Sequence, residues 1–138
     1  MVADSKSNPQ ARNININIRR QDGPNKPSRW EMFKVPVDPG ANVISCLQWI
    51  AENPTTADGK KSTPVVWDAN CLEEVCGACT MIINGKVRQS CSCLIDEYAP
   101  HDGDTITLEP MTKFPIVRDL WVDRSRIFET LKKAKAWV

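Results

Sequence analysis

The alternation of apolar and polar residues predicts two strands near the N-terminus. From Arg12 onward, three isoleucines fall on one face and three asparagines on the other, which is typical of a half-buried strand. Trp30 to Val37 alternates in a similar way and predicts a second strand. Residues 21–28 between them hold a glycine and two prolines and should form a loop, so the two strands are interpreted as a hairpin.

A helix is expected over about residues 43–52. Asn42 is a suitable N-cap, and the Asn53-Pro54 pair should end the helix. The apolar residues of this segment recur on one side, so the helix should lie across the sheet. Cys46 lies inside the helix among apolar neighbours, far in sequence from the other cysteines, and is interpreted as a small core residue.

Three later stretches complete the predicted elements. Residues 65–67 are a short apolar run, interpreted as a strand or as packing beneath the loop that follows. Residues 80–83 are apolar and precede Asn84-Gly85, which is the strongest short signal for a hairpin. Residues 105–109 alternate and predict the last strand. This order of elements indicates an α+β fold of the β-grasp type.

Most of the cysteines gather in one part of the chain. Cys71, Cys76 and Cys79 have four and then two residues between them, and Cys91 follows after eleven more. The first three match the C-x₄-C-x₂-C run that binds a plant-type 2Fe–2S cluster. The predicted hairpin returns the chain and would bring Cys91 back towards this loop as a fourth thiolate.

The neighbouring residues suit a loop that wraps around such a cluster. Gly77 and Ala78 are small, so the loop can point its amide N–H groups inward at sulfide. Such N–H groups would hydrogen-bond the sulfurs and help to set the reduction potential. Trp67, just before the loop, is interpreted as a large apolar side chain that shields the cluster from water.

Cys93 competes with Cys91 for the fourth ligand position. If a strand continues through both, residues two apart face the same side, and both sulfurs could point at the loop. The two positions would differ by roughly 6–7 Å along the strand, at about 3.3 Å of rise per residue. One sulfur must therefore be the native ligand and the other a spectator.

Other uses of the cysteines fit the pattern less well. Zinc sites usually take short C-x₂₋₄-C knuckles in pairs, whereas this chain has one three-cysteine loop and one distant partner. A Rieske centre needs two histidines, and His101 is the only one. The N-terminus has no apolar core region of a secretory signal, so six cysteines argue for a reducing compartment rather than for disulfides.

The net charge of +1 hides an uneven distribution. Residues 1–34 carry seven basic and three acidic side chains, residues 35–112 carry four and eleven, and residues 113–138 carry seven and three. We interpret this either as ordinary solvated surface or as basic ends that face protein partners. The basic residues are not interleaved with a nucleic-acid-reading motif, so nucleic acid is not expected as a partner.

Two stretches of the sequence resemble a known family. Residues 65–91, VVWDANCLEEVCGACTMIINGKVRQSC, resemble the N-terminal 2Fe–2S ferredoxin-like domain of the iron–sulfur subunit of succinate dehydrogenase and fumarate reductase. Residues 114–123, FPIVRDLWVD, and the helix expected after them look like the segment that joins the two domains of that subunit. This segment separates the chain from the small iron–sulfur subunits of the xanthine oxidase family, which share a similar cysteine spacing.

The resemblance implies an electron-transfer subunit with the iron held by Cys71, Cys76, Cys79 and Cys91. It implies that the FAD of a flavoprotein subunit supplies single electrons, which pass to further clusters and to quinone at membrane-anchor subunits. The chain would lie on the cytoplasmic or mitochondrial-matrix face of the respiratory membrane. It would hold no catalytic residue and no substrate site. A free-standing soluble 2Fe–2S ferredoxin is the alternative.

The sequence departs from the family after Cys93. The complete family subunit continues into a helical domain with 4Fe–4S and 3Fe–4S clusters, and the C-x₂-C-x₂-C-x₃-C-P pattern of that domain is not found here. We therefore expect a disordered N-terminus at 1–11, a 2Fe–2S domain at 12–110, and a linker and helix at 111–138 that lead to an absent domain. The chain is then either a fragment or one half of a split subunit.

The cysteine pattern makes a prediction about metal content. Protein prepared anaerobically is expected to be red-brown and to hold about two irons and two sulfides per chain. Metal and sulfide analysis, with electron paramagnetic resonance after reduction, measures this. A colourless protein with stoichiometric zinc and no iron, even after anaerobic reconstitution, would rule out the electron-transfer interpretation.

Overall fold

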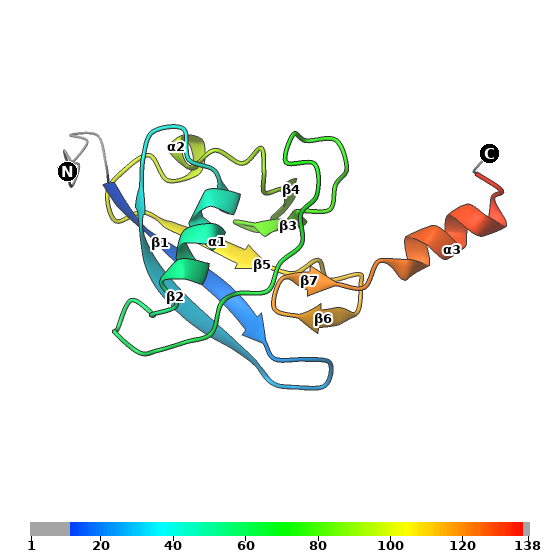
Figure 1. Cartoon of the computed structure of the whole chain (residues 1–138), viewed down its shortest axis with the longest axis horizontal. Helices are drawn as coiled ribbons and strands as arrows, with labels where there is room; N and C mark the ends of the chain where they lie inside the picture. The colour runs from blue at the N-terminus through cyan, green and yellow to red at the C-terminus, as the bar shows by residue number, and fades with distance from the viewer. Residues whose placement is uncertain (1–11, 137–138) are drawn as a thin grey trace, which may run out of the picture.

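The main element of the computed structural model, which describes residues 12–136, is a mixed sheet of five strands. Its strands are β1 (Arg12–Gln21), β2 (Ser28–Val37), β3 (Thr80–Ile83), β4 (Lys86–Gln89) and β5 (Thr105–Glu109). They lie in the order β2-β1-β5-β3-β4, with β1 parallel to β5 and the other neighbours antiparallel. α1 (Val43–Glu52) lies across one face (Figure 1). The predicted α+β fold of the β-grasp type is confirmed.

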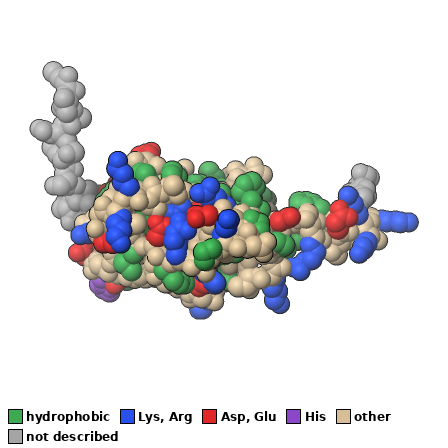
Figure 2. Space-filling model, turned by 90° about the horizontal axis from the view of Figure 1, so that it is seen from below, with side chains coloured by type: hydrophobic (Ala, Val, Ile, Leu, Met, Phe, Trp, Pro, Cys, Tyr) green, Lys and Arg blue, Asp and Glu red, His purple; other side chains and the backbone are tan. Residues whose placement is uncertain are grey.

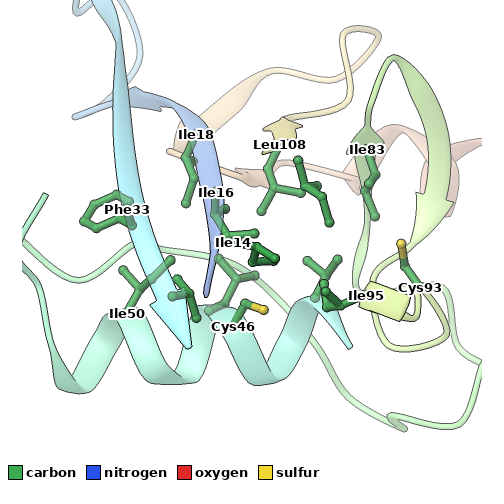
Figure 3. Packing of buried hydrophobic residues seen from close by; sticks show 14 of the residues in the cluster. Ile14, Ile16, Ile18, Phe33, Cys46, Ile50, Ile83, Cys93, Ile95 and Leu108 are labelled. Atoms are coloured by element: carbon green, nitrogen blue, oxygen red, sulfur yellow. The ribbon is translucent and has the colours of Figure 1, made fainter. Parts of the chain in front are cut away.

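The burial of β1 and β2 confirms the first predicted hairpin. The two strands pair along their whole length, from Arg12 opposite Val37 to Gln21 opposite Ser28. The isoleucines of β1 are fully buried and share one core with apolar residues of β2 and α1. Figure 3 shows this core between the sheet and the helix, with Cys46 inside it. Cys46 is a core residue, as the sequence predicted.

Asn42 caps α1 as predicted. Its side-chain oxygen accepts a hydrogen bond from the N–H of Ser45 at 2.9 Å, and the Ser45 hydroxyl accepts one from the Asn42 N–H at 3.0 Å. This reciprocal pair is a capping box, which satisfies N–H groups that have no partner inside the helix. The helix ends at Glu52, immediately before Asn53-Pro54.

The Asn84-Gly85 turn joins β3 to β4 as predicted. The two residues have φ of 48° and 79°, so both are left-handed, as a two-residue turn between antiparallel strands requires. A four-residue helix, α2 (Ile95–Tyr98), follows this hairpin, and the chain then enters β5.

The apolar run at 65–67 packs beneath the following loop and forms no strand. Val65 is buried in the main core. The backbone of Val66 pairs with a distant turn. Its N–H donates to the Asp119 carboxylate at 3.0 Å, and its carbonyl accepts from the Leu120 N–H at 3.0 Å. The interpretation as packing is therefore confirmed, and a separate strand is not formed.

A short hairpin that the sequence pattern did not predict follows β5. It consists of β6 (Ile116–Arg118) and β7 (Trp121–Val122). Asp119, between the two strands, has a φ of 47°, a conformation that aspartate adopts more readily than most residues. Asp119 and Leu120 are buried, so the hairpin packs against the body of the domain.

A buried ion pair joins this hairpin to β1. Arg20 and Asp119 are both fully buried, and the Nε and Nη2 atoms of Arg20 donate to the two carboxylate oxygens at 3.0 Å each. The other N–H donors of Arg20 reach Glu31 and the oxygen atoms of residues 62–64. Asp119 also accepts from the N–H of Gln21 at 3.1 Å. Both charges are thus paired and hydrogen-bonded, as burial of an ion pair requires.

α3 (Ser125–Lys133) extends away from the rest of the domain. Figure 1 shows it projecting beyond β6 and β7, and none of its side chains is buried. Ile127, Phe128 and Leu131 are exposed on it. Figure 2 shows Lys and Arg side chains along the same extension. The helix therefore carries both apolar and basic surface that the domain leaves uncovered.

Two further expectations concern the ends of the chain. The expected disorder at 1–11 lies outside the described residues. The last helix, which we expected to run to about Trp137, ends at Lys133. Among residues 12–136, no helix combines the length and apolar content needed to cross a lipid bilayer.

The buried ion pair generates a stability prediction. Arg20→Gln is expected to lower the free energy of unfolding by about 3–5 kcal/mol, because Asp119 would remain buried as an unpaired charge. Arg19→Gln is the matched control. Arg19 is its neighbour on β1, is 43% exposed and bridges Glu109 at 3.6 Å, so its loss should cost about 1 kcal/mol or less. Urea unfolding followed by circular dichroism compares the two variants. Equal losses would contradict a special role for the buried pair.

Candidate metal centre

The β3–β4 hairpin and the start of α1 hold Cys91 beside the cysteine loop. Cys79 directly precedes β3, and Cys91 follows shortly after β4. The N–H and the hydroxyl of Ser90 donate to the Cys79 carbonyl at 3.3 and 2.9 Å. The side-chain amide of Asn42 donates to the Cys91 carbonyl at 3.1 Å. The N-cap of the helix therefore also positions the fourth cysteine of the motif.

The four sulfurs lie as two adjoining pairs. The N–H of Cys71 donates to Cys76 Sγ at 3.4 Å, and the N–H of Cys76 donates to Cys71 Sγ at 3.3 Å. Cys79 and Cys91 lie together in one small buried cluster. The backbone of Glu74 acts to lower the pKa of the Cys91 thiol and the charge of Cys71 acts to raise it, so both loop residues lie near Cys91. The structure thus brings the predicted residues together.

Further backbone N–H groups of the loop point at the sulfurs. The N–H groups of Glu73 and Val75 donate to Cys71 Sγ at 3.4 Å each. The N–H of Ala78 donates to Cys76 Sγ at 3.4 Å. This inward arrangement of donors is the one that the sequence predicted for a loop around a negatively charged centre.

Left-handed residues give the loop this shape. Leu72, Glu74 and Gly77 have φ of 61°, 63° and 74°. Glycine adopts this conformation freely, whereas it costs energy for leucine and glutamate. Of the two small residues that the sequence singled out, Gly77 supplies the backbone turn and Ala78 supplies the N–H donor. Strained residues at a cysteine loop are typical of a functional site.

The hydrogen bonds change the acidity of the thiols. The backbone N–H groups of Glu73, Cys76 and Val75 lower the pKa of the Cys71 thiol to about 7, because they stabilise the thiolate. Burial raises the pKa of Cys91, and the adjacent Cys79 thiol adds to this effect. Neighbouring thiolates repel one another. A metal centre that binds them would compensate their negative charge.

Cys91 and Cys93 do not lie on one continuing strand. β4 ends at Gln89, and the two cysteines then enter different clusters. Cys91 packs with Cys79, whereas Cys93 is fully buried in the main core (Figure 3). The two sulfurs therefore do not both face the loop, because alternation of side chains holds only while the strand continues.

The remaining candidate ligands lie in unsuitable surroundings. Burial raises the pKa of Cys46 to about 12 and that of Cys93 to about 11. Both are therefore protonated thiols near neutral pH, and a thiol must lose its proton to bind a metal. The side chain of His101 is 83% exposed in a surface loop.

The site is shielded on one side and open on the other. Cys79 and Cys91 are buried, and Trp67 packs against them and against the main core, as expected for a shielding residue. Cys76 is exposed. Beside it lies a hollow of about 650 Å³, whose lining includes Ala78, Trp121, Arg124 and Phe128. The open side is thus formed by the cysteine loop together with the C-terminal segment.

Arg124 is the residue of this site that the sequence analysis missed. It lies at the N-cap of α3, and its guanidinium donates to the carbonyls of Gly77 at 2.6 Å and Ala78 at 2.7 Å. A weaker contact reaches the Thr80 carbonyl at 3.3 Å. No local pattern identifies such a contact, because its acceptors are backbone atoms far away in sequence.

The donor set fits a 2Fe–2S cluster. Within residues 12–136, no three Cys, His, Asp or Glu side chains are placed to hold one common metal ion. The sulfur contacts instead define the pairs Cys71 with Cys76 and Cys79 with Cys91. Two iron ions joined by sulfide take four thiolates in all, and N–H donors around the thiolates stabilise their charge.

The chain matches a known domain family. The family described as "2Fe-2S iron-sulfur cluster binding domain" matches residues 15–129. The chain is also similar in fold to a chain of the solved structure titled "Mycobacterium smegmatis Sdh1 complex in the apo form". That match has a TM-score of 0.75 and 22% sequence identity, and it covers 89% of this chain and 47% of the other.

Curated relatives share sequence over most of this chain. The "Succinate dehydrogenase iron-sulfur subunit" of Bacillus subtilis is 53% identical over 129 residues, which are 94% of this chain and 49% of that protein. The "Fumarate reductase iron-sulfur subunit" of Haemophilus influenzae is 28% identical over 106 residues, which are 77% of this chain and 37% of that protein. The chain thus spans about half or less of the length of these relatives.

The geometry predicts that Cys91, and not Cys93, is the fourth ligand. Cys91→Ser, which offers a harder oxygen ligand, is expected to lose the cluster or to lower its potential strongly. Cys93→Ser and Cys46→Ser should keep the visible and paramagnetic resonance spectra, because both thiols belong to the core. Since a shifted loop could recruit Cys93 in the first variant, the double variant is made as well. Bleaching by Cys93→Ser, with Cys91→Ser unchanged, would refute the assignment.

Proposed function

Because the chain belongs to the family of 2Fe–2S iron–sulfur cluster binding domains, we propose that it carries single electrons in a succinate dehydrogenase or fumarate reductase. Cys71, Cys76, Cys79 and Cys91 are the proposed ligands. The observation that carries this proposal is the convergence of these four thiols at a loop whose N–H groups point at sulfur. When bound, the cluster supplies reversible one-electron oxidation and reduction.

The residues around the sulfurs have separate tasks in this proposal. The N–H groups of Glu73, Val75 and Ala78 stabilise the thiolates and the negative charge that reduction adds. Trp67 keeps water from the buried pair of sulfurs. Neither of these tasks makes or breaks a covalent bond, so the chain is proposed to hold no substrate site and no catalytic residue.

The proposed partners follow from the relatives. A flavoprotein subunit with FAD is the proposed electron donor, and further clusters and a quinone at membrane-anchor subunits are the proposed acceptors. The chain is accordingly proposed to lie at the cytoplasmic or mitochondrial-matrix face of a respiratory membrane. Residues 12–110 would form the cluster domain, and residues 111–138 would lead towards the part of the assembly that holds the 4Fe–4S and 3Fe–4S clusters.

Exposed apolar residues near the open side support contact with protein partners. Leu72 and Val75, in the cysteine loop, are 53% and 77% exposed. Phe128, on α3, is 62% exposed and lines the hollow beside Cys76. Apolar surface that gathers at one place on a protein is typical of an interaction site. Electron transfer between proteins also needs the partner to approach the open side of the site.

A free-standing soluble ferredoxin is the second candidate function. It shares the cysteine loop and the fold, and it would exchange electrons with unattached partners. The apolar residues Ile127, Phe128 and Leu131 on the uncovered α3 favour a chain that docks into a larger assembly.

Electron exchange with a flavoprotein tests the proposal. The cluster-loaded chain is mixed anaerobically with the flavoprotein that copurifies with it, and paramagnetic resonance follows the reduced cluster. Succinate is expected to reduce the oxidised cluster, or fumarate to reoxidise the reduced one, only when the flavoprotein is present. Dithionite serves as the control that the cluster can be reduced. A cluster that responds to dithionite but to neither acid would support the free-standing ferredoxin instead.

A further inference from the structure

Arg124 connects the C-terminal segment directly to the cysteine loop. Its Nη1 atom donates to the Gly77 carbonyl at 2.6 Å, and its Nη2 atom donates to the Ala78 carbonyl at 2.7 Å. The two carbonyls belong to consecutive peptide groups between Cys76 and Cys79. A planar guanidinium can hold both of them at once, whereas a lysine would present a single point charge.

The peptide between Gly77 and Ala78 links the guanidinium to a sulfur. Its carbonyl accepts from Arg124, and its N–H donates to Cys76 Sγ at 3.4 Å. A hydrogen bond to the carbonyl polarises the peptide and strengthens the hydrogen bond that its N–H donates. The charge of Arg124 therefore acts on Cys76 through one peptide group as well as through space.

The positive charge of Arg124 is not neutralised by a carboxylate. None of the ion pairs formed among residues 12–136 involves Arg124. Asp68 and Asp123 line the same hollow. Asp123 uses its carboxylate to accept from the Ser125 N–H at 2.8 Å. The loop thus experiences a cation whose hydrogen-bond partners are neutral carbonyls.

We propose that Arg124 is a positioning residue that fixes the N–H donor at Cys76 and makes the cluster easier to reduce. This inference rests on the proposed 2Fe–2S cluster. Reduction adds one negative charge at the cysteine loop, and a nearby cation and a strengthened N–H donor both stabilise that charge. Loss of Arg124 therefore lowers the reduction potential, while the four cysteine ligands stay the same.

The reduction potential of the cluster in the complete chain tests this role. Arg124→Gln is expected to decrease the equilibrium constant for reduction roughly tenfold, which is about 59 mV for a one-electron couple. The matched control is Arg126→Gln, which removes the same charge from an exposed residue that contacts the Lys113 carbonyl and the Phe114 ring. This control should keep the wild-type potential.

Hydrogen exchange of the loop amides gives a second readout. In Arg124→Gln, the Ala78 and Cys79 amides are expected to exchange faster than in the wild type, both with and without the cluster. Arg124→Lys keeps the charge but loses the two-pronged contact, so its potential should lie between those of the wild type and Arg124→Gln. If Arg124→Gln fails to hold a cluster, Arg124→Lys carries the measurement.

Three outcomes would overturn the inference, and none of them depends on electron exchange with a flavoprotein. The first is a wild-type potential in Arg124→Gln, or in Arg124→Lys where only that variant holds a cluster. The second is an equal shift in Arg126→Gln, which would indicate charge at long range rather than positioning. The third is unchanged exchange at Ala78 and Cys79. A wild-type chain that binds no cluster would instead refute the proposed function.

Discussion

The buried pair of Arg20 and Asp119 is the interaction on which the arrangement of the site depends. It joins three segments, which are the end of β1, the residues just before the cysteine loop and the turn between β6 and β7. β1 is a long paired strand, whereas the segment before the cysteine loop is irregular and the β6–β7 hairpin is short. Because an unpaired buried charge is costly, no one of the three can move away alone. The path of residues 62–66, which lead into the cysteine loop, is thereby held between a residue of the main sheet and a residue of the β6–β7 turn.

Local signals in the sequence were sufficient to predict most of the fold and the convergence of the four cysteines. The alternation in β1, the N-cap at Asn42 and the Asn84-Gly85 turn each act within a few residues, so their physical cause is visible in the sequence. The cysteine spacing is local in the same sense. These features were predicted because each one satisfies its hydrogen bonds or buries its apolar side within a single element or hairpin.

The features that escaped prediction are contacts between distant segments. Arg20 and Asp119 are separated by 99 residues, and Arg124 reaches Gly77 across 47 residues. A charged residue in a strand pattern gives no sign that it will be buried, since its partner is elsewhere in the chain. The alternation pattern alone also left open which side Cys93 faces, because the end of β4 depends on how the following residues pack into the core. Local pattern thus identifies elements, and tertiary contacts decide where each one stops.

The parallel pairing of β1 with β5 also determines when the domain can form during synthesis. Ile16 of β1 is paired with Ile106 of β5, so β1 leaves the ribosome long before β5 has been synthesised. Until then, the β1–β2 hairpin is unpaired along the β1 edge as well as along the β2 edge and has an uncovered apolar face, which is an aggregation hazard for a nascent chain. The cysteines at 71–79 also emerge before β5 does. The sheet that supports the site is therefore completed only after all four cysteines of the motif have been synthesised.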